Sequence, residues 1–213
     1  DRLLQQCEIL FDAANKRCFL IIDAAGSGKT NMLSAISLKR VGIPTIALFA
    51  KAFSEGGNII ETALNEAIAR DLNVPLEGRT FEKFLYEAHA ELERAGKYVL
   101  VLIDGINEFS NDAALAESIR LTVAKYQNQR VRFVATCRDI YWQFFRDTLQ
   151  GSAYKVNSGN LRRYTDSEYS LALSKYLKDY GLDHVRMDET VQDAFRSPIL
   201  LRFFWERLIA GRR

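Results

Sequence analysis

Four runs of apolar residues, each as long as a β-strand, constrain the fold of this chain more than any other feature. A strand with one face in water alternates apolar and polar residues, whereas a strand of a parallel sheet is covered on both faces and is apolar almost throughout. The runs are of the second kind: RCFLIID at 17–23, IPTIALFA at 43–50, YVLVLID at 98–104 and VRFVATC at 131–137. We therefore predict a buried, mainly parallel sheet, to which the short segment YKV at 154–156 adds a fifth strand.

Amphipathic helical patterns separate these runs and predict the layers around the sheet. They cover residues 31–40, 58–72, 80–95 and 112–127, and Thr80 is the predicted N-cap of the third. A further helical pattern at 2–14 precedes the first run. Strands that alternate with helices are typical of an α/β fold whose parallel sheet has helices on both faces. The sequence thus predicts a three-layer α/β domain over residues 1–160.

The last quarter of the chain changes character and predicts a small helical subdomain at 161–213. The segment TDSE at 165–168 is a capping-box pattern that opens a helix. Ser197 and Pro198 are typical of an N-cap followed by proline at the first helical position. No strand pattern occurs in this part of the sequence.

A glycine-rich loop follows the first apolar run and leads into a helix. Residues 24–30 read AAGSGKT, so a loop with few side chains ends in one cation and one hydroxyl. The first N–H groups of a helix have no partner inside it and carry partial positive charge, and glycines let such groups converge on an anion. We predict a phosphate-binding loop, with the Lys29 charge on phosphate and the Thr30 hydroxyl on Mg²⁺. Its predicted nucleotide contacts are Ala25, Gly26, Ser27, Gly28, Lys29, Thr30 and Asn31.

Asp23 departs from the phosphate-loop pattern G-x-x-x-x-G-K-[ST], which has glycine at this position. Asp tolerates unusual backbone angles better than most residues, so the loop can keep its shape. A carboxylate near phosphates would instead weaken nucleotide binding. The alternative to a phosphate site is a glycine-rich turn that contains a lysine by chance.

An acidic motif ends the third apolar run and predicts a metal site. Asp104 follows the buried strand in VLIDGINE at 101–108, where it can hold Mg²⁺ directly or through water. Glu108 lies four residues further on and can orient or deprotonate the attacking water. The alternatives are an ordinary turn at Asp104 and an ordinary acidic residue at a helix start for Glu108.

A third motif, VATCRD at 134–139, places Thr136 and Arg138 at the end of the fourth run. Ligands of open α/β sheets bind at the carboxyl edge of the strands, so Arg138 can contact the γ-phosphate or the charge that develops on it. The alternative for Arg138 is an ion pair with Asp139 or with a neighbouring helix. The predicted catalytic group is Lys29, Glu108 and Arg138.

Together these motifs resemble those of STAND-class P-loop ATPases, and most of all the NACHT branch. The resemblance is carried by AAGSGKT, LVLIDGINE, VATCRD and SPILLRFF and covers essentially the whole chain. Many P-loop ATPases have the catalytic Glu directly after the metal-binding Asp, whereas here Gly105 takes that place and the acid is displaced to Glu108, as in NACHT proteins. The family commonly has Asp where this chain has Asn107.

The resemblance implies a P-loop NTPase core whose sensor strand, VATCR, lies between the loop strand and the LVLID strand, followed by a helical lid at 161–213. It implies an ATP- and ADP-binding, Mg²⁺-dependent switch with slow hydrolysis that controls homo-oligomer formation. By the same resemblance Lys29 and Thr30 bind phosphate and Mg²⁺, Asp104 coordinates the metal, Arg138 senses the γ-phosphate and Pro198 contacts adenine.

We also expect the chain to be a piece of a longer signalling or defence protein. In such proteins a winged-helix region and sensor repeats would follow Arg213, and an effector domain would precede Asp1. Two other functions stay open. A P-loop kinase or other phosphotransferase would have the loop strand and the LVLID strand side by side. A nucleotide-dependent scaffold or DNA-associated adaptor without turnover is kept open by Asp23 and Asn107.

Composition excludes several classes of function. The net charge is +2, from 29 Lys and Arg against 27 Asp and Glu, and these charges are interleaved, so the sequence gives no indication of nucleic-acid binding. No segment has the length and apolar character of a membrane span or a signal peptide. Three scattered cysteines lack metal-ligand spacing and are typical of a reducing, cytoplasmic protein.

Overall fold

The computed structural model describes residues 16–39, 42–71, 80–156, 164–179, 181, 188–197, 200–201 and 204–205. Its contacts divide the chain into two compact units, and each is described by itself. The larger consists of Asp1–Ile22 and Thr30–Asn157, and the smaller of Asp23–Lys29 and Ser158–Arg213. The roles predicted for residues 1–160 and 161–213 stay predictions.

The strands form a mainly parallel sheet, as the apolar runs predict. They are β1 (Cys18–Asp23), β2 (Thr45–Phe49), β3 (Val99–Asp104), β4 (Val131–Arg138) and β5 (Ala153–Val156), in the spatial order β2-β3-β4-β1-β5. The pairs β2–β3, β3–β4 and β1–β5 are parallel. Strands β2, β3, β4 and β1 form the body of the sheet, and the short β5 lies at its edge beside β1.

The strand order confirms one prediction and argues against one alternative. The strand that carries VATCR, β4, lies between β1 and β3, as expected for a sensor strand between the loop strand and the acidic strand. A kinase-type core would have placed β1 and β3 side by side, and they are not neighbours.

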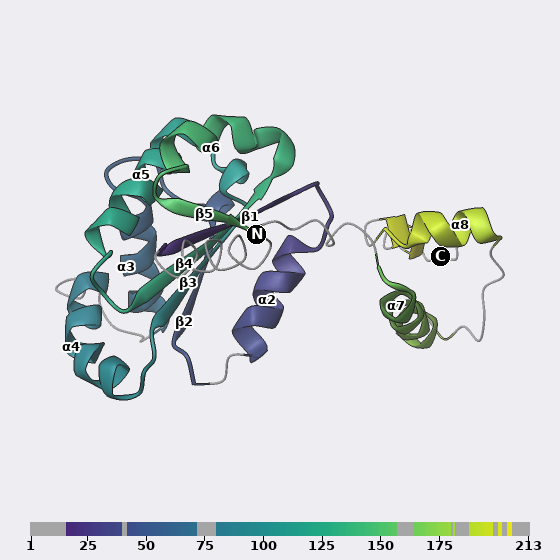
Figure 1. Ribbon diagram of the computed structural model, residues 1–213, viewed down its shortest axis with the longest axis horizontal. Coiled ribbons are helices and arrows are strands. Elements are labelled where there is room, and N and C mark those ends of the chain that lie inside the picture. Colours follow the sequence, from purple (N-terminus) through teal and green to yellow (C-terminus); the bar gives the residue numbers. More distant parts are fainter. Residues whose placement is uncertain are drawn as a thin grey trace, which may run out of the picture. The chain divides into compact units, whose positions relative to one another are not determined.

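Right-handed connections explain how the helices are distributed over the sheet. From β1 the chain crosses to the far edge at β2 through α2 (Lys29–Lys39). Every later connection returns in the opposite direction, through α3 (Ile59–Asp71) and α4 (Phe81–Arg94), then α5 (Asp112–Lys125), then α6 (Trp142–Leu149). Because crossovers between parallel strands are right-handed, α2 lies on one side of the sheet and α3, α4 and α5 on the other (Figure 1).

The main hydrophobic core lies on the side of the sheet that faces away from α2. Its strand residues alternate along each strand, and the register places them on one face, where they pack against α3 to α6: Cys18, Leu20, Ile22, Ile46, Leu48, Val99, Val101, Ile103, Val131, Phe133, Ala135, Cys137 and Ala153. On the α2 face Ile21, Leu100 and Leu102 are buried, whereas Phe49 at the end of the edge strand β2 is 50% exposed and Leu38 of α2 is 78% exposed.

An ion-pair network joins three helices of the core side. The Lys125 ammonium lies 2.7 Å from a carboxylate oxygen of Glu61 and 3.0 Å from one of Glu82, and Tyr126 donates its hydroxyl to Glu61 at 2.5 Å. Burial alone would raise the pKa of Glu61, but the hydrogen bonds from Lys125 and Tyr126 outweigh burial and hold that pKa below its usual value. Burial and the bond to Glu61 together raise the pKa of Tyr126.

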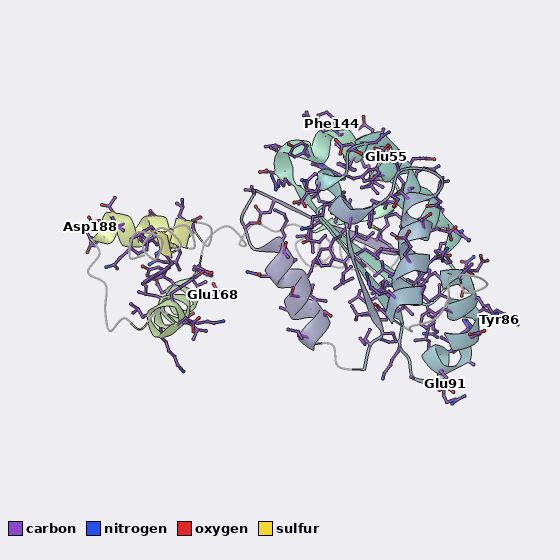
Figure 2. The ribbon with its side chains drawn as sticks, turned by 180° about the vertical axis from the view of Figure 1, so that it is seen from behind. Glu55, Tyr86, Glu91, Phe144, Glu168 and Asp188 are labelled. Carbon is purple, nitrogen blue, oxygen red and sulfur yellow. The ribbon has the colours of Figure 1, made fainter. Side chains whose placement is uncertain are left out.

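The smaller unit contains α7 (Asp166–Asp179) and α8 (Glu189–Phe195). The predicted capping box is confirmed: Thr165 N–H donates to the Glu168 carboxylate at 2.8 Å, and Glu168 N–H donates to the Thr165 hydroxyl at 3.3 Å. Helix α8 was not predicted; it is seven residues long and begins after the N-cap Asp188. Figure 2 shows Glu168 and Asp188 at the starts of these helices.

Two predictions of the sequence lie outside the described residues. They are the helix at 2–14 and the adenine contact Pro198. No helix among the described segments combines the length and the apolar character that crossing a bilayer requires.

Candidate functional site

The segment between β1 and α2 has the backbone of a tight loop. Gly26 and Gly28 have φ values of 71° and 91°, in the left-handed region that side chains other than glycine rarely adopt. A Cβ atom at Gly28 would meet nothing within 4 Å. The backbone angle, and not a lack of space, therefore explains the glycine at this position.

Both charged side chains of this loop bind the loop's own backbone. The Lys29 ammonium donates to the carbonyl oxygens of Asp23 at 2.8 Å and Ala24 at 2.6 Å, and to the Ser27 hydroxyl at 3.3 Å. The Asp23 side chain is almost fully buried, and one of its carboxylate oxygens accepts a hydrogen bond from Ala24 N–H at 2.7 Å. Helix α2 begins at Lys29 itself, so Lys29, Thr30 and Asn31 form its first turn.

In the larger unit, Asp104 is held by two hydroxyl groups from different elements. Thr30 at the start of α2 donates to one carboxylate oxygen at 2.7 Å. Thr136 of β4 donates to the other at 2.6 Å and accepts from Gly105 N–H at 2.8 Å. Thr136 is completely buried, so its hydroxyl fixes the orientation of the carboxylate from inside the sheet. We call this arrangement of Thr30, Asp104 and Thr136 the carboxylate clamp.

A left-handed turn after Asp104 folds Glu108 back toward the strand end. Gly105 has a φ of 68° and precedes the 3₁₀ turn η2 (Ile106–Glu108). Glu108 N–H donates to the Gly105 carbonyl at 2.8 Å. A Cβ atom at Gly105 would lie 3.0 Å from the Glu108 side chain. The left-handed angle therefore favours glycine here, and a Cβ atom would in addition force the Glu108 side chain to shift, which explains the residue that follows Asp104.

Arg138 forms an ion pair with the predicted base. One of its guanidinium nitrogens lies 3.4 Å from a Glu108 carboxylate oxygen, and about two fifths of each side chain is exposed. The sequence left open a pair with Asp139 or with a helix, and in the structure the guanidinium pairs with Glu108 of η2. The Asn107 side-chain oxygen accepts from Arg138 N–H at 2.9 Å. The backbone at Arg138 is thereby tied to η2, a role that the sequence pattern did not reveal.

An apolar groove of about 290 Å³ adjoins the carboxylate clamp and was also not predicted. It lies between α2 and the strands β2 and β3, and Leu33, Leu38 and Phe49 contribute to its lining. Thr30 and Asp104 line it as well. Its apolar side chains come from α2, β2 and β3. The sequence alone does not show that these three segments are neighbours, so the groove becomes recognisable only when the strand order is known.

The structure brings together four of the predicted site residues in two contacting pairs, Thr30 with Asp104 and Glu108 with Arg138. Residues 23–29 belong to the smaller unit, so their geometry is given separately above. Within the described part of the chain, no three His, Cys, Asp or Glu side chains gather into a metal-binding group.

Comparison with known proteins identifies solved structures with a similar fold. No family model and no curated protein matches the sequence. The chain is similar in structure to the Aeropyrum pernix ORC2 protein in ADPNP and ADP complexes, with 14% identity, a TM-score of 0.50, and coverage of 83% of this chain and 50% of that one. A chain of Drosophila ORC bound to GC-rich DNA and Cdc6 gives 10% identity, a TM-score of 0.50, and coverage of 73% and 27%.

A third solved structure, Cdc6p from Pyrobaculum aerophilum, has 16% identity and a TM-score of 0.45, and covers 82% of this chain and 48% of its own. This chain thus spans about half the length of the archaeal proteins, and less of the Drosophila one. At these identities the likeness establishes the architecture alone, and the chain has a P-loop NTPase-like α/β fold.

Proposed function

We propose that this chain is an ATP- and ADP-binding, Mg²⁺-dependent switch module that hydrolyses ATP slowly and controls homo-oligomer formation in a larger, cytoplasmic STAND- or NACHT-like signalling protein. The observation that carries the proposal is the carboxylate clamp. It joins the hydroxyl directly after Lys29 to the acidic residue at the carboxyl end of a neighbouring strand, through Thr30 and Asp104 at 2.7 Å. These are the residue types that a Mg²⁺-nucleotide requires side by side.

The residues have separable roles in this proposal. The amide groups of the loop and the Lys29 ammonium bind the phosphates, Thr30 and Asp104 hold Mg²⁺, and Pro198 contacts the base. Mg²⁺, when bound, supplies positive charge that neutralises phosphate oxygens. Thr136 keeps the Asp104 carboxylate in one orientation, because it donates from a fully buried position.

Glu108 and Arg138 are proposed to act in hydrolysis. Glu108 accepts the proton of the attacking water, and Arg138 binds the oxygens of the γ-phosphate. Their mutual ion pair at 3.4 Å keeps both groups at the same sheet edge. A γ-phosphate that attracts Arg138 competes with Glu108 for the guanidinium, so binding of ATP, but not ADP, changes the environment of the base.

A nucleotide-binding scaffold without turnover is the second candidate. Two observations favour it: the Asp23 carboxylate binds a loop amide at 2.7 Å, and Glu108 is engaged by Arg138. The two candidates differ in one measurable property, the rate at which bound ATP is converted to ADP and phosphate.

Calorimetric titration with Mg²⁺-ATP and Mg²⁺-ADP tests nucleotide binding. We expect Lys29→Ala to lose measurable binding, because the ammonium is the cation of the predicted phosphate site. Lys83→Ala on the exposed side of α4 is the matched control and should bind as the unmodified protein does. Circular dichroism melting checks that both variants fold. Unchanged affinity of a folded Lys29→Ala protein would refute the proposal.

Single-turnover phosphate release separates the ATPase from the scaffold. We expect Glu108→Gln to bind ATP normally and to release phosphate about tenfold or more slowly. Glu91→Gln is the control, since Glu91 projects from the outer side of α4, away from the sheet (Figure 2). Equal rates for the Glu108 variant and the unmodified protein would exclude Glu108 as the base, and no release from either would favour the scaffold.

A further inference from the structure

The loop between β1 and α2 already contains an anion of its own. Asp23 occupies the position where the phosphate-loop pattern has glycine. Its side chain is 1% exposed, and its Oδ1 atom accepts a hydrogen bond from Ala24 N–H at 2.7 Å. An amide at the start of the loop, of the kind that cradles phosphate in such loops, is therefore bound to a carboxylate of the same loop.

The cation of the loop is engaged in the same way. The Lys29 ammonium donates to the backbone carbonyl of Asp23 at 2.8 Å and to that of Ala24 at 2.6 Å. The Asp23 carbonyl and carboxylate belong to the same residue, so the Lys29 ammonium that binds the carbonyl also lies near the carboxylate. The seven residues 23–29 thus hold one negative and one positive side chain, whereas a loop that begins with glycine would carry only the positive one.

We propose that Asp23 is an internal competitor of phosphate that determines the affinity of this loop for nucleotides. The inference rests on the proposed nucleotide-binding function and goes beyond it, since it assigns the affinity to one residue outside the predicted contacts. A phosphate bound by the amides that follow Ala24 lies close to the negative charge of Asp23, and a phosphate that also reaches Ala24 N–H has to displace the carboxylate from it. The repulsion rises with the charge of the ligand, so Asp23 weakens ATP binding more than ADP binding and leaves nucleoside binding unaffected.

Two substitutions separate the two costs. In Asp23→Asn the side-chain oxygen can still accept from Ala24 N–H, but the negative charge is gone. In Asp23→Gly the charge is gone and the amide is released as well, which restores the usual loop pattern. For a carboxylate about 6 Å from a phosphate charge at an effective dielectric constant near 20, the interaction corresponds to roughly a hundredfold in affinity before screening by salt.

The experiment is a calorimetric titration of the full chain with adenosine, AMP, ADP and ATP in the presence of Mg²⁺. We expect Asp23→Asn to bind ATP about tenfold to a hundredfold more tightly than the unmodified protein, with a smaller gain for ADP and none for adenosine. Asp23→Gly should gain at least as much. Asp147→Asn, an exposed residue of α6, is the charge-matched control and should change nothing. Added sodium chloride should reduce the gain, because salt screens charges.

The outcomes distinguish this inference from the proposed function. If the unmodified protein binds ATP and the Asp23 variants bind it equally or more weakly, Asp23 does not compete with phosphate and the inference is wrong while the function stands. A gain of the same size for adenosine would also overturn it. If neither the unmodified protein nor any variant binds a nucleotide, both ideas fail. Asp23→Asn keeps the test valid if Asp23→Gly does not fold.

Discussion

Replacement of Thr136 by valine tests the carboxylate clamp, because it removes the hydroxyl and leaves the shape of the side chain nearly unchanged. The buried hydroxyl makes two hydrogen bonds, one to the Asp104 carboxylate at 2.6 Å and one from Gly105 N–H at 2.8 Å. A hydrogen bond to a charged group contributes about 1.5–3 kcal/mol, and a buried N–H left without a partner costs about 1–3 kcal/mol. The two overlap, so we expect Thr136→Val to lower the free energy of unfolding by about 2–4 kcal/mol.

The matched control is Thr136→Ser, which keeps the hydroxyl and deletes one buried methyl group, at a cost of about 1 kcal/mol. Urea denaturation measures both, and with a typical slope of about 2 kcal/mol per molar the valine variant should unfold at about 1–2 M less urea. The chain has two tryptophans, and Trp205 belongs to the smaller unit. Both variants should therefore be made in a Trp205→Phe background, so that Trp142 alone reports on the sheet. A valine variant as stable as the serine variant would refute the clamp as a stabilising feature.

Two further perturbations test the turn after β3 and the helix network. Gly105→Ala should destabilise the fold by about 1–2 kcal/mol, because its φ of 68° is left-handed and the new Cβ would lie 3.0 Å from Glu108; thermal melting measures this. Gly151→Ala, where a Cβ meets nothing within 4 Å, should change stability by less than about 0.5 kcal/mol, and equal losses at both sites would contradict the argument. The pKa of Glu61 is lowered in the folded state, against the opposing effect of burial, by the hydrogen bond from Lys125 and a second from a tyrosine. The stability that this provides is present above the unfolded pKa of about 4.3 and is lost as the pH falls through the folded value. Glu61→Gln should therefore flatten the acid limb of a stability–pH profile from urea titrations, and an unchanged acid limb would show that the network does not couple to folding.

Most of the sheet could be predicted from sequence because β1 and β3 are buried along almost their whole length, whereas the edge strand β2 leaves Ala47 and Phe49 exposed, contrary to the expectation of burial on both faces. Runs such as YVLVLID at 98–104 leave no polar face and therefore indicate where a buried strand lies, and β3 spans Val99–Asp104. One capped helix start was also predictable: Thr80 accepts from Lys83 N–H at 3.2 Å, as its position before an amphipathic pattern indicates.

Contacts that depend on the register between distant segments could not be predicted from the sequence. Arg138 and Glu108 are 30 positions apart, and a shift of one residue between β3 and β4 would turn the side chains to opposite faces. The same holds for the Thr136 hydroxyl, which the sequence placed at the correct edge without indicating that it would hold Asp104. Helix α8 was missed because seven residues span too few turns to show a period.

The unequal cover of the two sheet faces has a mechanical consequence. Strands β1 to β4 are anchored by the packing of α3, α5 and α6, whereas α2 contributes Leu33 as its one buried side chain among those that the structure describes. The sheet face toward α2 holds buried Ile21, Leu100 and Leu102, fewer than the core residues on the other face, so tilting α2 would expose less apolar area than the same displacement of α5. The helix that begins at Lys29 can thus be displaced at a smaller cost in buried apolar area than α5, and the packing of β1 to β4 against α3, α5 and α6 is retained when it moves.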